Sequence, residues 1–359
     1  MYPNPDMLRL ARQRRGFQQI EAARKLCIEQ PLLSRMENGL SEIRPEVLMV
    51  AAQVYEVPKS FFFQTDPIYG APVSVHPMWR KKADVSAKEA DAVVAELNVR
   101  VMHLRRLLEA ARIANTSDLP RLDIEDYGSP AKVAAVLRAH WGVSRGPIKD
   151  LTALAEKAGV LIVHSAMGGA SISGVSFAVP GMPRLIVLNS DQPADRMRFT
   201  LAHELGHAVM HKFPTPAMED EANKFASALL LPAADLRPYL VGRRIELSLL
   251  AALKPEWRVS MQSLLMAITE AKPLTPNQAQ YLWKQLSARG YRLREPPELD
   301  FEHEKPTVVD SLVRVHREGL GYSISDLCQF LHVHEHDLNV LYASAQPEGA
   351  RVPKITIVK

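Results

Sequence analysis

Two histidines, His203 and His207, stand four residues apart, with Glu204 beside the first of them. On a helix this spacing directs both imidazoles from one face, so they can chelate a single metal ion. Glu204 lies one step round the helix, within reach of a water at that ion. Zinc would activate the water and polarise a carbonyl, and Glu204 would take up the proton and return it. The pattern indicates a zinc site with hydrolytic chemistry; the alternative is two ordinary histidines on an amphipathic helix.

The residues around this motif predict a small sheet followed by two helices. Runs rich in β-branched and apolar residues predict three strands, at about 159–164, 174–179 and 184–189. Pro193 then opens a helix that we expect to continue through His211 and to stop at Pro214. A second helix is expected over about 219–231.

A catalytic zinc needs a third protein ligand. His211 is two helical turns from His203, about 12 Å along the axis, so one ion cannot easily hold both. The acidic residues 219–221 open the next helix. Glu221 shares a helical stripe with Phe225 and should turn inward, which makes it the candidate. The alternative is that Glu221 is only an acid favoured by the helix dipole.

Length and composition favour several globular domains. The chain has 359 residues, 47% hydrophobic and 23% charged, and the net charge of +4 is compatible with nucleic-acid binding. Its two cysteines, Cys27 and Cys328, support neither a disulfide framework nor a thiolate metal site. The first residues carry no secretion pattern, and no apolar run is long enough to cross a bilayer. We therefore expect a cytoplasmic protein with no membrane partner.

The N-terminal part predicts a bundle of four or five short helices, and a longer helix follows it. Glycine and proline signals place the short helices at about 6–15, 18–25, 31–37 and after Pro45. The segment at about 86–114 has apolar residues at helical spacing and predicts an amphipathic connector packed on the next domain. A coiled-coil homodimer is the alternative for this helix. Residues 323–342 indicate another helix-turn-helix-like unit.

The metal motif resembles the ImmA/IrrE family of zinc metallopeptidases over about residues 145–235. The resemblance is carried by Arg198-Phe199-Thr200-Leu201-Ala202-His203-Glu204-Leu205-Gly206-His207 and by Glu221-Ala222-Asn223-Lys224-Phe225-Ala226-Ser227-Ala228-Leu229-Leu230-Leu231-Pro232. It implies His203, His207 and Glu221 as zinc ligands and Glu204 as the catalytic base. Members of that family cleave repressor-type regulators with narrow specificity.

Residues 7–63 resemble the Cro/repressor-type (XRE) helix-turn-helix domain. The resemblance is carried by Gly16-Phe17-Gln18-Gln19, Ala22-Ala23, Pro31-Leu32-Leu33-Ser34-Arg35-Met36-Glu37-Asn38-Gly39 and Val57-Pro58-Lys59-Ser60-Phe61-Phe62. It implies a recognition helix in the major groove of double-stranded DNA. The side chains expected to reach bases or phosphates are Gln19, Gln30, Pro31, Ser34, Arg35 and Asn38. The alternative is a bundle for protein contact, with Arg12, Arg14 and Arg15 on a solvated face.

We therefore expect an α+β fold, mainly α, with a helix-turn-helix domain, a zincin-like domain built on a three-stranded sheet, and a C-terminal helical region. The expected boundaries are 1–65, 66–118 for the linker and amphipathic helix, 119–235, and 236–359. The expected function is a DNA-binding transcriptional regulator with zinc metalloendopeptidase activity. Its substrate would be a transcriptional regulator, an antitoxin-like protein or the chain itself. The alternative is a non-proteolytic transcription factor or antitoxin-like regulator whose metal domain senses a ligand or partner.

Overall fold

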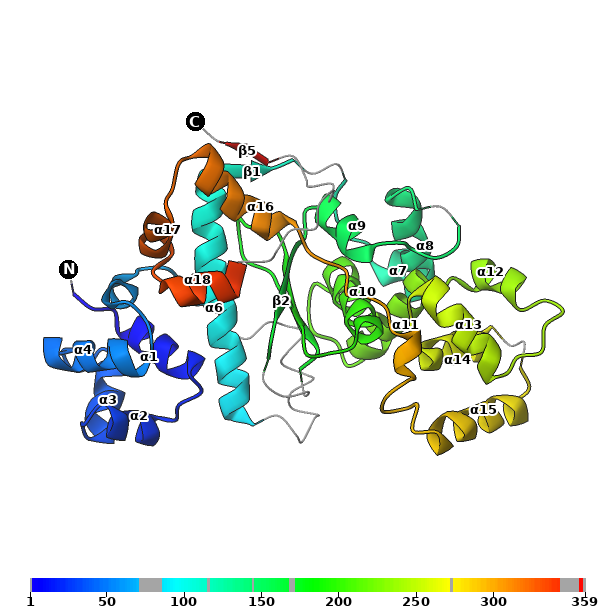
Figure 1. Ribbon diagram of the computed structural model, residues 1–359, viewed down its shortest axis with the longest axis horizontal. Helices are drawn as coiled ribbons and strands as arrows, with labels where there is room; N and C mark the ends of the chain where they lie inside the picture. Colours follow the sequence, from blue (N-terminus) through cyan, green and yellow to red (C-terminus); the bar gives the residue numbers. More distant parts are fainter. Residues whose placement is uncertain are drawn as a thin grey trace. The chain divides into compact units, whose positions relative to one another are not determined.

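The fold is mainly helical, with two small sheets (Figure 1), which confirms the predicted fold class. The computed structural model describes residues 2–70, 86–114, 117–143, 145–167, 172–271, 274–342 and 355–357. The expected linker is thus described only in part. Among the described residues, none of the helices combines the length and the apolar surface needed to span a bilayer.

The chain divides into two compact units. The first contains Met1–Ala114, Phe177–Met182 and Thr307–Lys359, and the second contains Asn115–Ser176 and Pro183–Pro306. The second unit is therefore inserted between two parts of the first. The region that we expected as one C-terminal helical segment, 236–359, is shared between the two units, because its last helices pack on the N-terminal half of the chain.

The first unit begins with a bundle of four short α-helices and a 3₁₀ turn. These elements are α1 (Pro5–Arg14), α2 (Gln19–Lys25), α3 (Gln30–Glu37), α4 (Pro45–Val54) and η1 (Lys59–Phe63). Asn4 caps α1 by accepting a hydrogen bond from the Asp6 N–H. The buried side chains of Met7, Leu33 and Phe62 lie in one continuous core.

The long helix α6 (Ala87–Glu109) belongs to this unit and starts with a capping box between Ser86 and Glu89. Its apolar stripe is buried: Ala95, Val99 and Met102 pack into the core of the N-terminal bundle. The helix we expected as an amphipathic connector is therefore a structural part of the first unit. Other segments of this unit also pack on α6. They are α16 (Val308–Arg314), α17 (Ile324–Leu331) and α18 (Glu335–Tyr342). A short π-helical turn (Val315–Gly319) continues α16. Strand β1 (Ala111–Ile113) pairs antiparallel with β5 (Ile355–Ile357).

A buried polar network joins α1, α6 and α18. Glu96 accepts from Arg14 Nε at 2.7 Å and from Arg100 Nε at 3.0 Å. Arg100 also donates to the Leu341 carbonyl, and His103 Nδ1 lies 2.8 Å from the Tyr342 hydroxyl. The C-terminal helices are thus fixed to the bundle through charged side chains, of which Arg100 is buried and Glu96 is half-buried.

This network predicts an acid-sensitive contribution to the stability of the first unit. Burial raises the pKa of Glu96, but Arg14 and Arg100 outweigh burial and lower that pKa to about 2. A carboxyl whose pKa is lower in the folded than in the unfolded chain stabilises the fold at every pH above its unfolded pKa. For Glu96 this stabilisation is lost as the pH falls from about 4.5 towards 2. In denaturant titrations of the full chain, the stability difference between wild type and Glu96→Gln should be largest above pH 5 and shrink on acidification. A constant difference, like that expected for the exposed Glu42→Gln, would contradict the assignment.

The second unit contains the predicted three-stranded sheet. Strands β2 (Leu161–Ser165) and β4 (Leu185–Asn189) are parallel, with Leu161 opposite Leu185 and Ser165 opposite Asn189. Strand β3 (Gly174–Phe177) lies on the other side of β4, so β4 is central. The buried apolar residues of the sheet pack against the long helix α10 (Ala194–Met210) and its neighbours.

Helices cover the rest of this unit. They are α7 (Ile124–Tyr127), α8 (Pro130–His140), α9 (Leu151–Lys157), α11 (Met218–Leu230), α12 (Ala233–Leu236), η2 (Arg237–Tyr239), α13 (Leu247–Trp257), α14 (Met261–Glu270), α15 (Pro276–Ala288) and η3 (Pro297–Leu299). Lys254 on α13 is 1% exposed and pairs with Asp195 in the first turn of α10 at 2.5 Å and with Glu295 at 2.8 Å. This pairing anchors the start of the helix that carries the metal motif.

Candidate metal centre and nucleic-acid interface

Helix α10 carries the motif and is shorter than we expected. It ends at Met210, and His211 has an extended backbone, with φ −104° and ψ 112°. The expectation that the helix continues through His211 was therefore wrong. His211 is the C-cap of the helix, and its N–H still donates to the His207 carbonyl at 3.1 Å. Its ring lies against that of His207, with the two Nδ1 atoms 3.0 Å apart.

The two motif histidines direct the same ring atom to one place. His203 Nε2 and His207 Nε2 are 3.0 Å apart, and both residues are at most 8% exposed. His203 Nδ1 donates to Asn223 Oδ1 at 3.0 Å, which keeps the proton on Nδ1 and leaves a lone pair on Nε2. Two lone pairs that face each other at this distance repel unless a cation lies between them.

Glu219 is the carboxylate that the structure brings to this pair. Its Oε2 is 3.5 Å from His203 Nε2 and its Oε1 is 3.4 Å from His207 Nε2. Oε1 is buried and has no hydrogen-bond partner in the described structure. Within the described residues, His203, His207 and Glu219 form the one group of side chains placed to share a metal ion. Three converging donors and an orphaned carboxylate oxygen fit zinc.

Glu221, which the family resemblance implies as the third ligand, lies elsewhere. Its Oε2 is 3.1 Å from His211 Nε2. Phe225, one turn after Glu221, packs at Gly206 on α10, whereas Glu221 itself meets His211, just beyond the end of that helix. Glu219 and Asn223, four residues apart, form the stripe that meets the histidine pair. This spacing was visible in the sequence as a signal for Glu219.

Glu221 still acts on the centre through a chain of hydrogen bonds. When Glu221 accepts from His211 Nε2, the bare Nδ1 of His211 can accept from His207 Nδ1. That arrangement fixes the tautomer of His207 with its lone pair on Nε2.

Glu204 lies beside the centre, where a general base is needed. It is 2% exposed, and it accepts a hydrogen bond from the backbone N–H of Ser176 in the edge strand β3. Its Oε2 has no partner in the described structure. Burial raises the pKa of Glu204, which makes the carboxylate a better proton acceptor.

The close approach of α10 and α11 depends on a glycine in the motif. A Cβ built on Gly206 would lie 2.9 Å from the Phe225 ring. Any side chain at this position would push α11, and Glu219 with it, away from the histidines. Gly206 therefore belongs to the architecture of the centre.

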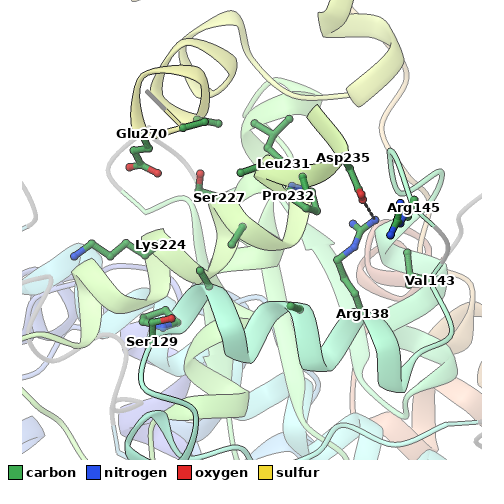
Figure 2. Close-up of a pocket in the computed structure, with 18 of the residues that line it drawn as sticks. Ser129, Arg138, Val143, Arg145, Lys224, Ser227, Leu231, Pro232, Asp235 and Glu270 are labelled. Carbon is green, nitrogen blue, oxygen red and sulfur yellow. Dashed lines mark ion pairs between the residues drawn. The ribbon is translucent and has the colours of Figure 1, made fainter. Parts of the chain in front are cut away.

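The other side of α11 lines a separate cavity of about 710 Å³. Figure 2 shows Lys224, Ser129 and Glu270 at one end and Arg138, Arg145 and Asp235 at the other, with Leu231 between them. Arg138 and Asp235 form an ion pair at 3.5 Å. The same helix thus borders both the metal centre and this cavity.

In the first unit, the predicted DNA-contacting residues divide into two groups. Pro31, Arg35 and Asn38 are exposed on or just after α3. Gln30 and the half-buried Ser34 lie on the same helix. Asn38 Nδ2 donates to the Ser34 carbonyl at 2.7 Å.

The two glutamines belong to a polar chain that reaches into the core. Gln30 Nε2 donates to Gln19 Oε1 at 2.8 Å, and Gln19 Nε2 donates to Glu37 Oε2 at 2.9 Å. Glu37 is 1% exposed and forms a two-point ion pair with Arg12. Arg12 is therefore a buried partner of Glu37, and Arg14 pairs with Glu96, so the solvated basic face that we considered as an alternative does not form.

Two family models match the chain. Residues 8–62 match the helix-turn-helix family, and residues 155–269 match the peptidase family described as IrrE N-terminal-like domain. The two modules occur in the predicted order, which confirms that prediction. The second match extends beyond the resemblance seen in the sequence, through α13 and α14. No curated protein matches the chain.

Proposed function

We propose that this chain, a helix-turn-helix domain combined with an IrrE-like peptidase domain, is a DNA-binding transcriptional regulator that works as a zinc-dependent metalloendopeptidase. Its substrate would be a specific regulator, such as a repressor or an antitoxin-like protein, or the chain itself. The family matches support a regulator with a peptidase domain. A homodimer and a cytoplasmic location remain parts of the proposal.

The convergence of His203 Nε2, His207 Nε2 and the Glu219 carboxylate carries the metal part of this proposal. These residues would hold zinc, with Glu219 rather than Glu221 as the third ligand. Zinc bound there would supply Lewis acidity that polarises a peptide carbonyl.

The chain's own residues supply the proton transfer and the positioning. The free Oε2 of Glu204 can accept a proton from water and pass it to the leaving amine. The Ser176 N–H holds the other side of this carboxylate in place. Asn223 and His211 orient the two imidazoles. Edge strand β3 offers a backbone along which an extended peptide can lie.

Metal analysis of the purified full chain tests this part directly. We expect about one zinc per chain, since three protein ligands suit a single catalytic ion. His203→Ala and His207→Ala should each lose the metal. Zinc retained at the wild-type level in both variants would contradict the assignment.

The DNA-binding part predicts that Gln30→Ala weakens sequence preference more than general affinity. Glutamine can pair with adenine through two hydrogen bonds, and losing such a contact costs about 1–3 kcal/mol at that base. Binding of the full chain to a selected operator and to a scrambled duplex should be compared over a range of salt concentrations, with the exposed Gln53→Ala as the matched control. An unchanged ratio of the two affinities in Gln30→Ala would remove Gln30 from the interface.

The non-proteolytic alternative has one observation in its favour. The cavity on the far side of α11 is of a size that binds small molecules, and it borders the helix that carries Glu219. In that case the metal domain would sense a ligand and transmit its binding to DNA. The two functions differ in their need for Glu204, because a sensor keeps its regulatory effect after Glu204→Gln and a peptidase does not.

A further inference from the structure

Arg184 extends over the side of the sheet that faces the metal-motif helix. It immediately precedes β4, and its Nη1 is 3.4 Å from Ser176 Oγ on β3. A Cβ at Gly174 would meet Thr200 on α10, so that side of β3 faces α10. Ser176 is two residues further along the strand and its side chain shares this side. Glu204 follows Thr200 by one helical turn, so the Arg184 guanidinium lies next to the centre.

No carboxylate among the described residues lies within ion-pair distance of Arg184. Arg121 is likewise without one: its Nη1 donates to the carbonyls of Ala208 and His211 at the end of α10. Burial lowers the pKa of Arg184 and the charge of Arg121 lowers it further, while Glu204 opposes both. Arg121 is exposed and keeps its hydration, but Arg184 is half-buried and has lost part of its own, so an anion that reaches Arg184 would compensate for that loss.

The charges of the centre leave room for such an anion. A divalent ion with Glu219 and Glu204 is neutral when both histidines are neutral. Arg184 and Arg121 then add two positive charges. The negative charge of Glu204 is already balanced by the divalent ion in this sum, so it does not also cancel the two arginines.

We propose that Arg184, assisted by Arg121, binds an acidic side chain of the substrate close to the scissile bond. This inference rests on the proposed peptidase function and names its substrate class: an extended segment with Asp or Glu near the point of cleavage. In an extended peptide on β3, every second side chain points to the same side of the sheet. A carboxylate one or two positions from the scissile bond can therefore reach the guanidinium, and a planar guanidinium suits a carboxylate better than an ammonium would.

Short peptide hydroxamates test this inference without any cleavage, because the hydroxamate binds zinc directly. A set that carries Glu, Gln or Lys at one position at a time should be titrated into the zinc-loaded full chain by calorimetry. At one position of the peptide, the hydroxamate with Glu should bind at least about tenfold more tightly than the one with Gln, because hydrogen bonds between charged groups are stronger than those between neutral groups. The hydroxamate with Lys at that position should bind more weakly than either. Arg184→Gln should remove the preference for Glu, whereas the exposed Arg196→Gln on the first turn of α10 should retain it.

Three outcomes would overturn the inference in distinguishable ways. Equal binding of Glu and Gln at every position would overturn the acidic subsite and leave the zinc peptidase intact. A preference for Glu that survives Arg184→Gln would assign the subsite to other residues. If no hydroxamate binds, the zinc centre itself is refuted, and the subsite falls with it.

Discussion

The Glu219→Ala variant should lose zinc almost completely, while Glu221→Ala should keep most of it. Glu219 contributes the carboxylate whose oxygens lie 3.5 and 3.4 Å from the Nε2 atoms of His203 and His207, so its removal leaves two neutral ligands for a divalent ion. Mutation of a residue that only orients a metal ligand lowers the affinity for the metal about 10–100-fold. Removal of a ligand itself should lower it by more than that. Glu221 touches His211 and orients His207 from a distance, so we expect a loss of about tenfold.

Chelator competition, followed by metal analysis, measures both affinities. Asp220→Ala is the matched control, because Asp220 is an exposed neighbour that pairs with Lys224. Circular dichroism shows whether each variant is folded. If Glu221→Ala loses zinc and Glu219→Ala keeps it, the third ligand implied by the family resemblance is restored and the geometry of α11 is misassigned.

The second large effect concerns the stability of the DNA-binding bundle. Glu37→Gln leaves the Arg12 guanidinium, 8% exposed, without its ionic partner in the core. Breaking a buried ion pair from one side costs about 3–5 kcal/mol, which is a large part of the stability of a small domain. The variant also replaces one of the two carboxylate oxygens with an NH2 group, so the single remaining oxygen cannot accept from Arg12 at two points and from Gln19, which holds Gln30. We therefore expect partial unfolding of the first unit together with loss of sequence-specific DNA binding.

Chemical denaturation of the full chain and a DNA-binding assay measure these two effects. Glu42→Gln is the control, because Glu42 is exposed. A double change, Arg12→Met with Glu37→Leu, should recover much of the stability, since an apolar pair can replace a buried ion pair at little cost. Stability unchanged in Glu37→Gln would show that this pair does not hold the bundle together.

Local spacing was enough to predict how the two motif histidines lie. Because four residues are nearly one helical turn, the i, i+4 pattern predicted that the rings of His203 and His207 converge, as they do. The caps and turn residues predicted the helices of the bundle to within a few residues. The strands before the motif also followed from local composition, since β-branched runs between glycines form strands wherever a helix can cover them.

The third ligand could not be derived in the same way. Whether Glu219 or Glu221 meets the histidines depends on how α11 crosses α10. That crossing is set by the contact of Phe225 with Gly206, two residues that are distant in sequence. The contact of His211 with Glu221 was likewise not predictable from the sequence, because it depends on where the chain leaves α10 and where α11 begins.

The grouping of the C-terminal helices was also invisible in the sequence. It depends on contacts such as that of Arg100 with the Leu341 carbonyl, which joins residues on either side of the whole second unit. The hydrogen-bonded chain from Arg12 to Gln30 could not be predicted either, because the sequence alone does not show whether an arginine is buried in the bundle or exposed to solvent.

If the chain regulates transcription by cutting a specific protein, the cut should be visible in cells and should depend on Glu204. Candidate regulators should be co-expressed with the wild-type chain or with Glu204→Gln, and the products identified by mass spectrometry, with zinc measured in both purified chains. The account predicts one discrete cleavage in a regulator, or in the chain itself, that disappears in Glu204→Gln while zinc and DNA binding are retained. A regulatory effect that persists in full in Glu204→Gln, with every regulator intact in both cultures, would contradict it.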